Sequence, residues 1–374
     1  MSIYKHKFIV FAIDHFNSLG IIRSLGEKGI NPIVVLYGEK SKLVQKSKYI
    51  SEYYRSNNIE ECYEYIKDNY SQELYKPFII ATTDETASCL DLHYDELVDK
   101  FHFFNAGEQG RITKMMEKEY IAHLAQSCGL KIPKTEEVNR GDMPKSVKFP
   151  IMTKSNTPTI HNWKANVFIC NNENELKEAY KHITQERVIL QEYIHKKNEL
   201  NYEGFAINNG QDLYMPYDNR YYRNTPSSYG QYGFIEKSQQ TELFHKIKEL
   251  VKETKFNGIF EIEFLIDQND NFYFVEINFR SSCWTYAYTK CGINLPIMYS
   301  QSVIDGKINT SEEDICKLPF KFMNVIPDFK INVKNGNLTF TKWVKDFLDI
   351  DCSFYFNKKD IMPFLYFIKN KIFK

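Results

Sequence analysis

The chain has 374 residues, too many for one small core and suited to about two to four packed units. With 43% hydrophobic and 26% charged residues it has the composition of an ordinary soluble protein, and its 48 basic residues balance 48 acidic ones. This balance excludes a global attraction for nucleic acid, so any phosphate must be bound by individually placed bases.

Cysteine usage and hydropathy indicate the compartment. The eight cysteines lack C-x-x-C spacing, which favours reduced thiols over a disulfide framework or a zinc site. The apolar run Phe8–Ile13 is too short for a signal peptide, and no stretch approaches the length of a membrane span. We therefore expect a cytoplasmic protein without a transmembrane segment.

The N-terminal part alternates between buried strands and helices. The apolar runs Phe8–Ile13, Ile33–Leu36 and Phe78–Ala81 are typical of parallel strands buried on both faces, because polar residues bound them. Helices expected over residues 17–26 and over Ile59–Asn69 fill the connections. The pattern predicts a Rossmann-like α/β unit.

Acidic residues follow the third of these strands. Asp84 and Glu85 lie at the carboxyl end of a strand, where open α/β sheets place ligands. They are either contacts for a substrate amine or part of a loop turn and helix cap. A dinucleotide site is rejected, because Asp14–Gly20 has one glycine instead of the G-x-G-x-x-G pattern.

Strands and helices continue to alternate downstream. The expected elements are a helix over Glu117–Gly129, a strand over Phe149–Lys154, a helix over Glu173–Thr184, strands over Val188–Gln191, Leu200–Ile207 and Asp212–Tyr217, and helices over Thr241–Thr254 and Ile297–Ile304. The segment Asn224–Gly233 predicts a loop at the rim of an active site. For the residues after Gly306 we expect packing on the core rather than contact with a membrane surface.

The most informative stretch predicts a hairpin. Ile259–Ile266 and Phe272–Phe279 are alternating strands joined by a polar turn at Asn269-Asp270. Pairing the strands across this turn sets Glu263 opposite Glu276, roughly 5 Å apart on one face. The same register sets Glu261 opposite Asn278.

Like charges at this distance repel, so a cation is expected between them. Two carboxylates and the Asn278 amide oxygen form the hard oxygen ligand set that suits Mg²⁺. Arg280, next on this face, has the planar fork that binds phosphate or carboxylate. The alternative is a hairpin whose acids are solvated, or neutralised by Arg280 and other bases.

These four residues resemble a known signature. Glu263, Glu276, Asn278 and Arg280, set in G-I-F-E-I-E-F and V-E-I-N-F-R, resemble the metal and phosphate site of the ATP-grasp superfamily. The branch is that of carbamoyl-phosphate synthase, biotin carboxylase and D-aspartate-ligase-like enzymes. Carbamoyl-phosphate synthase has Gln at the position of Glu263, and the family usually has Pro where this chain has Phe279. The resemblance implies ATP and Mg²⁺, with Mn²⁺ as a possible substitute.

The resemblance also implies phosphate-binding lysines. Lys154 ends a segment similar to the family strand that holds the α- or β-phosphate, and a flexible point charge suits that task. Lys118 matches the early basic residue of the lead-in helix. Lys164 lies in residues 155–165, where relatives have a glycine-rich flap and this chain has no glycine.

The remaining implied contacts concern adenine, ribose and the transferred phosphate. Q-E-Y-I resembles the family hinge, which places Glu192, Tyr193 and Ile194 at adenine and Glu199 at the ribose. Arg220 matches the basic residue that meets the γ-phosphate or the acyl phosphate, so Arg220, Arg280 and Lys164 are the expected catalytic residues. Arg223 is an alternative contact for a carboxylate substrate.

The resemblance implies a domain order and a reaction. We expect a pre-ATP-grasp domain over 1–110, a small lid subdomain over 111–190, a large subdomain with the metal site over 191–305, and an extension over 306–374 that packs on the core. The implied reaction is carboxylate–amine ligation through an acyl phosphate, with release of ADP and phosphate. The amine acceptor could be a cell-envelope precursor, a peptide or a sugar amine.

Alternatives to the ligase remain open. One is an ATP-grasp kinase, and another is a nucleotide-binding regulator without turnover. The chain is too short for carbamoyl-phosphate synthase and lacks the added signature of biotin carboxylase. The expected partners are small-molecule substrates and a second copy in a homodimer.

Overall fold

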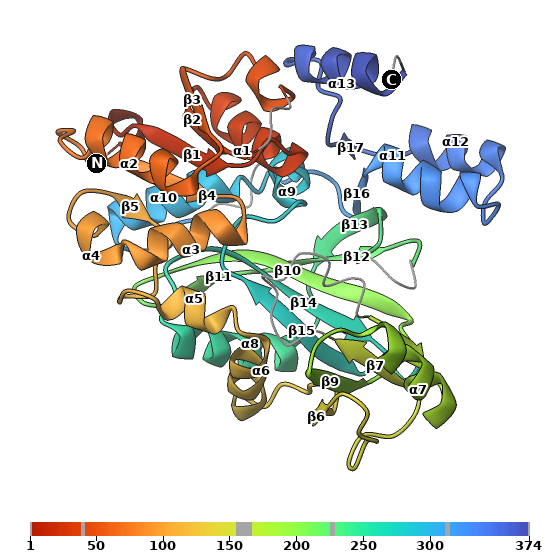
Figure 1. The fold of residues 1–374 in the computed structure, drawn as a ribbon. Helices are drawn as coiled ribbons and strands as arrows, with labels where there is room; N and C mark the ends of the chain where they lie inside the picture. Colours follow the sequence, from red (N-terminus) through yellow and green to blue (C-terminus); the bar gives the residue numbers. More distant parts are fainter. Residues whose placement is uncertain (1, 39–41, 155–166, 225–228, 311–314, 373–374) are drawn as a thin grey trace.

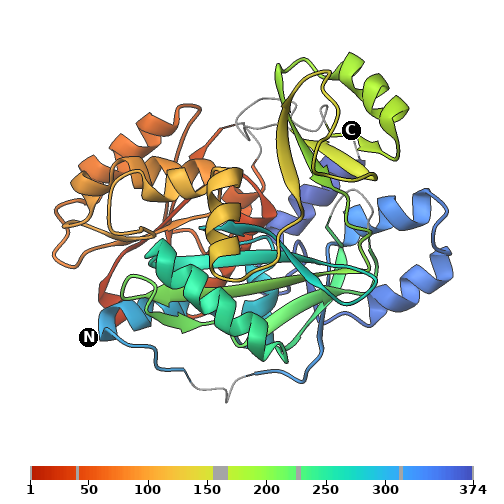
Figure 2. The ribbon, with the colours of Figure 1, turned by 90° about the horizontal axis from the view of Figure 1, so that it is seen from below.

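The computed structural model describes residues 2–38, 42–154, 167–224, 229–310 and 315–372. Its strands form three sheets within these ranges. In Figures 1 and 2 the N-terminal sheet with its helices and the small middle sheet lie at different ends of the large sheet. The predicted α/β class, with an α+β part downstream, is confirmed.

The N-terminal sheet is parallel and has the strand order β3-β2-β1-β4-β5. Its strands are β1 (Phe8–Ala12), β2 (Ile33–Tyr37), β3 (Glu52–Ser56), β4 (Phe78–Ala81) and β5 (His102–Phe103), and its helices are α1 (Phe16–Gly26), α2 (Ile59–Tyr70), α3 (Asp84–Leu92) and α4 (Tyr94–Leu97). Strands β1 and β4 are buried along their whole length, as their continuous apolar runs predict. The sequence did not reveal β3 or α3, because both carry many polar residues.

The small sheet is antiparallel and has the order β6-β9-β7-β8. Its strands are β6 (Thr135–Asn139), β7 (Ile151–Lys154), β8 (Ile169–Cys170) and β9 (Arg187–Glu192), with α7 (Glu173–His182) packed on them. Helices α5 (Arg111–Met115) and α6 (Lys118–Ser127) precede it. The sheet has an apolar core of its own, formed in part by Leu176, Val188 and Leu190.

The large sheet carries the predicted hairpin. Its order is β15-β14-β10-β12-β13-β16-β17, with β11 beside β10. The strands are β10 (Asn198–Ile207), β11 (Asp212–Tyr214), β12 (Tyr217–Tyr221), β13 (Tyr232–Lys237), β14 (Gly258–Ile266), β15 (Phe272–Asn278), β16 (Phe320–Met323) and β17 (Cys352–Ser353). Helix α8 is Thr241–Thr254, α9 is Thr285–Cys291 and α10 is Leu295–Asp305. Helices α9 and α10 both contact α1, and α10 also contacts β10, so they join the N-terminal and large sheets.

The predicted hairpin register is confirmed at the carboxylate pairs but is offset by one residue nearer the turn, because the hairpin contains a bulge that was not predicted. Glu263 pairs with Glu276 and Glu261 with Asn278, but the register shifts after Glu263, so that Phe264 pairs with Phe274. Val275 is the extra residue and is 38% exposed, whereas Phe274 is buried. The strict alternation predicted for this strand was therefore wrong between Phe272 and Val275. In the turn only Asp270 has a positive φ, of 60°.

The C-terminal segment packs on the core as expected and also adds strands to the large sheet. Strand β16 pairs with β13, and β17 pairs with β16. Its helices are α11 (Val325–Asp328), the π-helical turn η4 (Phe329–Lys334), α12 (Phe340–Leu348) and α13 (Met362–Ile372), and the short 3₁₀ turns near the N-terminus are η1 (Ile3–Lys5) and η2 (Val44–Lys46). Trp343 is buried and donates from Nε1 to Asp328 at 2.9 Å. No described helix is long and apolar enough to cross a bilayer. The domain boundaries 1–110, 111–190, 191–305 and 306–374 remain predictions.

Candidate active site

Glu263 of β14 and Glu276 of β15 lie opposite each other in the register of the two strands. Asn278 links the group, because its Nδ2 donates to Glu263 Oε1 at 3.2 Å and to Glu261 Oε2 at 3.3 Å. Burial raises the pKa of Glu263 well above its ordinary value, and the nearby charges of Glu261 and Glu276 raise it further. A divalent cation would relieve this repulsion, so the donor set fits Mg²⁺ held by Glu263, Glu276 and Asn278.

Arg280 continues this face and reaches the N-terminal sheet. Its Nε donates to Asp84 Oδ1 at 2.8 Å, and its Nη2 donates to Asn278 Oδ1 at 3.2 Å. Burial lowers the pKa of the guanidinium, but the carboxylates of Asp84 and Glu261 more than offset this, so the pKa stays above its ordinary value. Arg280 is therefore a permanent, fixed cation beside the predicted metal ligands.

Asp84 is part of a helix cap, the second of its two predicted roles. It also forms an ion pair that the sequence did not predict. It is the first residue of α3, after the N-cap Thr83, whose side chain accepts from Thr86 in a capping box. Its carboxylate also binds Arg280 across the junction of the two sheets. Glu85 is exposed, and no described residue forms a hydrogen bond or ion pair with its side chain.

Lys118 and Lys154 lie around one cavity of about 340 Å³. Lys118 begins α6 and Lys154 ends β7, and Phe274 and Val275 of β15 line the same cavity. Burial and the neighbouring Lys118 charge lower the pKa of Lys154 to about 8, although Glu276 opposes the shift. An anion between the two lysines would relieve their repulsion, so the pair fits a phosphate group.

The predicted hinge residues do not line this cavity. Glu192 ends β9, and its Oε2 accepts from the Lys134 N–H at 3.2 Å. The Tyr193 N–H donates to the Pro150 carbonyl at 3.0 Å, so it is not free to bind adenine. No described backbone carbonyl accepts from the Ile194 N–H, and the predicted adenine contact of this residue remains a proposal.

Glu199 is buried at the start of β10 and lies near Glu263, one of the predicted metal ligands. It forms an ion pair with Lys196, which the sequence did not suggest as its partner. Burial raises the pKa of Glu199, and the Lys196 charge opposes the shift. Its charge in turn helps to raise the pKa of Glu263. Its predicted contact with the ribose remains a proposal.

Arg220 and Arg223 were predicted to contact substrates, but both lie away from the face of the large sheet that carries Glu263. Side chains alternate along β12, and Asn219 faces Asn201 on the acidic side, so Arg220 points to the opposite side of the sheet. There it lies 3.3 Å from Asp218 and 3.7 Å from Glu236. Arg223 binds Asp328 at 2.7 Å and also Asp346, so it anchors the C-terminal segment rather than a carboxylate substrate. The structure thus corrects the placement of both residues. Lys164 lies outside the described residues.

Two buried acids were missed as site residues. Glu203 of β10 pairs with Glu261 of β14. Glu261 is two residues before Glu263 on the same strand and lies on the same face. Glu203 accepts hydrogen bonds from Ser282 Oγ and from Thr285 Oγ1, the latter at 2.7 Å. Polar residues at alternate positions of a predicted strand, Asn201 and Glu203, were the available signal, but only the sheet pairing shows which acid Glu203 meets.

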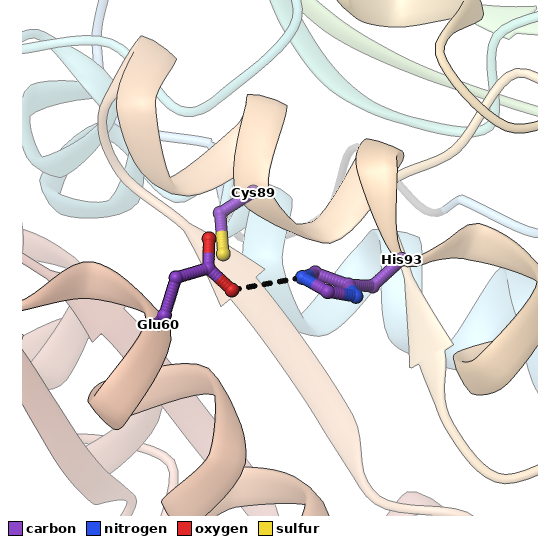
Figure 3. Close-up of side chains that lie close together, drawn as sticks. All are labelled: Glu60, Cys89 and His93. Atoms are coloured by element: carbon purple, nitrogen blue, oxygen red, sulfur yellow. Dashed lines mark hydrogen bonds and ion pairs between the residues drawn. The ribbon is translucent and has the colours of Figure 1, made fainter.

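A separate group of possible ligand atoms lies between α2 and α3. Figure 3 shows Glu60, Cys89 and His93 pointing toward one another. The His93 ring is already held between carboxylates, with Nε2 at 3.0 Å from Glu60 and Nδ1 at 3.2 Å from Glu96. Burial raises the pKa of Cys89 to about 12, which keeps its thiol protonated. We therefore assign this group to the packing of the helices.

Comparisons with known proteins concern the fold of the chain. No family model matches the chain. N5-carboxyaminoimidazole ribonucleotide synthase of Staphylococcus aureus is 26% identical over 180 residues, which are 45% of this chain and 44% of that protein. The chain therefore matches less than half the length of this curated relative.

Solved structures match over more of the chain. N5-carboxyaminoimidazole synthetase from Staphylococcus aureus has a TM-score of 0.65 at 15% identity and covers 88% of this chain and 86% of its own. L-amino acid ligase from Bacillus licheniformis has a TM-score of 0.61 at 14% identity, with coverages of 81% and 77%. Biotin carboxylase from Campylobacter jejuni, in complex with an ATP analogue, has a TM-score of 0.63 at 15% identity and covers 84% of this chain and 74% of its own. The chain thus shares the fold of these three enzymes, which agrees with the predicted resemblance at the level of the fold.

Proposed function

We propose that the chain is an Mg²⁺- and ATP-dependent ligase that activates a carboxylate as an acyl phosphate and joins it to an amine. The observation that carries the proposal is the pairing of Glu263 with Glu276, with Asn278 and Arg280 continuing the same face. Metal ligands and a fixed cation at the junction of two sheets suit phosphoryl transfer, which needs positioning and charge neutralisation.

Each step can be written for the residues present. A carboxylate oxygen attacks the γ-phosphorus of ATP and ADP leaves, with Lys118 and Lys154 neutralising the phosphates. Bound Mg²⁺ supplies further charge neutralisation at the phosphate oxygens. Arg280 stabilises the acyl phosphate. The amine nitrogen then attacks the carbonyl carbon and loses a proton, and phosphate leaves with an oxygen that came from the carboxylate.

Three findings on other proteins support this proposal. The matched structures include one named as an amino acid ligase, one in complex with ATP and one that holds MgADP and bicarbonate. For this chain we propose an amino-acid or peptide-type ligation, with a cell-envelope precursor, a peptide or a sugar amine as the acceptor. A cytoplasmic location, a homodimer and the use of Mn²⁺ in place of Mg²⁺ remain predictions.

The test traces an oxygen atom from the carboxylate substrate to the released phosphate. The chain is incubated with ATP, Mg²⁺, an amine and a carboxylate labelled with ¹⁸O, using a panel of amino acids. The ligase predicts ¹⁸O in the released phosphate, and hydroxylamine in place of the amine gives a hydroxamate. Release of ADP without phosphate indicates the alternative kinase. Binding of ATP without turnover across the panel indicates a nucleotide-binding regulator.

A further inference from the structure

A second pair of acids lies next to the metal ligands, and the reaction outlined above does not use it. Glu203 and Glu261 are opposite each other on neighbouring strands, and their exposed fractions are 1% and 4%. Like charges placed opposite each other in a sheet are destabilising. The proposed Mg²⁺ ligands are other residues, and Arg280 is the nearby charge that lowers the pKa of both acids, so a further positive group would relieve the remaining repulsion.

The loop after Arg280 is built around Glu203. Ser282 Oγ and Thr285 Oγ1 donate to the two carboxylate oxygens of Glu203. Each hydroxyl also accepts a backbone N–H, from Trp284 at 2.9 Å and from Ser282 at 3.0 Å respectively. The hydroxyl protons are thereby directed at the carboxylate, which favours its charged form. The two hydroxyl donors therefore orient the Glu203 side chain as a hydrogen-bond acceptor.

Asn201 adds an independent acceptor on the same face. It is 2% exposed, it lies opposite Glu263, and it is two residues before Glu203 on β10. Its Nδ2 donates to Tyr221 Oη at 3.1 Å, which fixes the amide. Its Oδ1 is buried and has no hydrogen-bond partner among the described residues. Because buried polar atoms normally have partners, this oxygen points to a ligand that donates.

The amide group of Asn278 connects Arg280 to Glu261, one of these acceptors. Asn278 receives a hydrogen bond from Arg280 at 3.2 Å on its oxygen and donates from its nitrogen to Glu261 at 3.3 Å. A fixed cation and a set of acceptors are thus separated by a single planar group. An α-amino acid has the complementary arrangement, because one carbon separates its ammonium group from its carboxylate.

We propose that Glu203, Glu261 and Oδ1 of Asn201 bind the ammonium group of an α-amino acid whose carboxylate lies at Arg280. This inference rests on the proposed function, since it makes that amino acid the carboxylate substrate. An ammonium group supplies three N–H donors and one positive charge, which match three acceptor groups and offset the paired acids. Bicarbonate has no such group and is excluded as the preferred substrate.

The experiment measures binding rather than turnover. The full-length chain with Mg²⁺ and a non-hydrolysable ATP analogue is titrated with amino acids and with the same acids lacking the amine. The matched probes are L-alanine and propionate, L-aspartate and succinate, and L-phenylalanine and 3-phenylpropionate, followed by D-enantiomers and bicarbonate. We expect at least one amino acid to bind about tenfold or more tightly than its partner.

Isosteric variants assign that preference to the site. In Glu203→Gln and in Glu261→Gln the preference for the amino acid should fall below about threefold, with the affinity for the ATP analogue unchanged. Glu253→Gln, on the exposed side of α8, is the matched control and should keep the preference. A melting curve for each variant checks the fold. The wild-type comparison needs no variant and stands if either one fails to fold.

Other outcomes separate this inference from the proposed function. If an amino acid binds more tightly than its matched acid but no ¹⁸O reaches the released phosphate, the ammonium site is supported and the proposed ligase activity is refuted. Transfer of ¹⁸O with equal binding of both members of every matched pair keeps the ligase and overturns the ammonium site. A Mn²⁺ titration tests a second metal ion, and loss of one Mn²⁺ in Glu203→Gln with the amino acid preference intact also overturns it.

Discussion

Arg280 and Asp84 are 196 residues apart in the chain, and the Nε of Arg280 donates to Oδ1 of Asp84 at 2.8 Å. This ion pair joins the end of β15 in the large sheet to the first turn of α3, at the carboxyl end of β4. The N-terminal unit thus helps to orient the cation that we propose for acyl phosphate stabilisation. An isolated large sheet would lack this contact.

The ion pair leads to the first prediction. Asp84→Asn keeps the helix start but removes a charged acceptor, so Arg280 would rely on Asn278 and Ser281 alone. We expect kcat for phosphate release to fall about tenfold while KM for ATP changes little. Steady-state kinetics measure both values. Glu85→Gln, the exposed neighbour, is the control, and equal kcat values for the two variants would show that the ion pair is dispensable.

The second prediction concerns the proposed metal ligands. Glu276→Gln removes one carboxylate of the opposed pair and keeps the shape of the side chain. We expect turnover to fall by about a hundredfold or more, because charge on the transferred phosphate loses its counter-ion. The melting temperature should stay level or rise, since repulsion with Glu263 is removed. Glu276→Ala should also lose turnover and keep its fold. Full activity in either variant would disprove the metal assignment.

The third prediction is a pH dependence of nucleotide binding. Burial lowers the pKa of Lys154 to about 8, so its positive charge is lost as the pH rises above that value. We expect the affinity for ADP, measured in EDTA by calorimetry, to weaken between pH 8 and pH 9 by up to about tenfold. Lys154→Arg keeps its charge and should show a flatter profile. Matching profiles for wild type and variant would contradict the role of Lys154.

The fourth prediction is a pH dependence of stability. Burial, with the Glu261 charge, raises the pKa of Glu203 from 4.5 to about 8. Between these values the unfolded chain loses the proton that the folded chain keeps, so the free energy of unfolding falls as the pH rises. Urea unfolding at pH 5 to 8 in EDTA should show a smaller fall for Glu203→Gln than for wild type. The control Glu253→Gln should behave as wild type, and parallel curves for all three proteins would refute the assignment.

The sequence by itself determined the elements whose patterns are local. Continuous apolar runs identified β1, β2 and β4, and the limits of β4 and α8 agree with the structure. The hairpin of β14 and β15 was predicted from its local pattern, and the bulge at Val275 offsets the pairs near the turn but leaves the predicted pairs of Glu263 and Glu261 in place. This placed Glu263 opposite Glu276 and indicated a cation site before any fold was known.

Tertiary structure decided which distant residues meet. The bulge at Val275 lies where packing of Phe274 against the core outweighs strict alternation. The side of the sheet on which Arg220 lies depends on how β12 pairs with β10, and no local pattern shows that pairing. The meetings of Glu203 with Glu261 and of Asp84 with Arg280 likewise join segments separated by many residues. A sequence specifies such contacts only through the whole fold, because burial and pairing are set by every strand in the sheet.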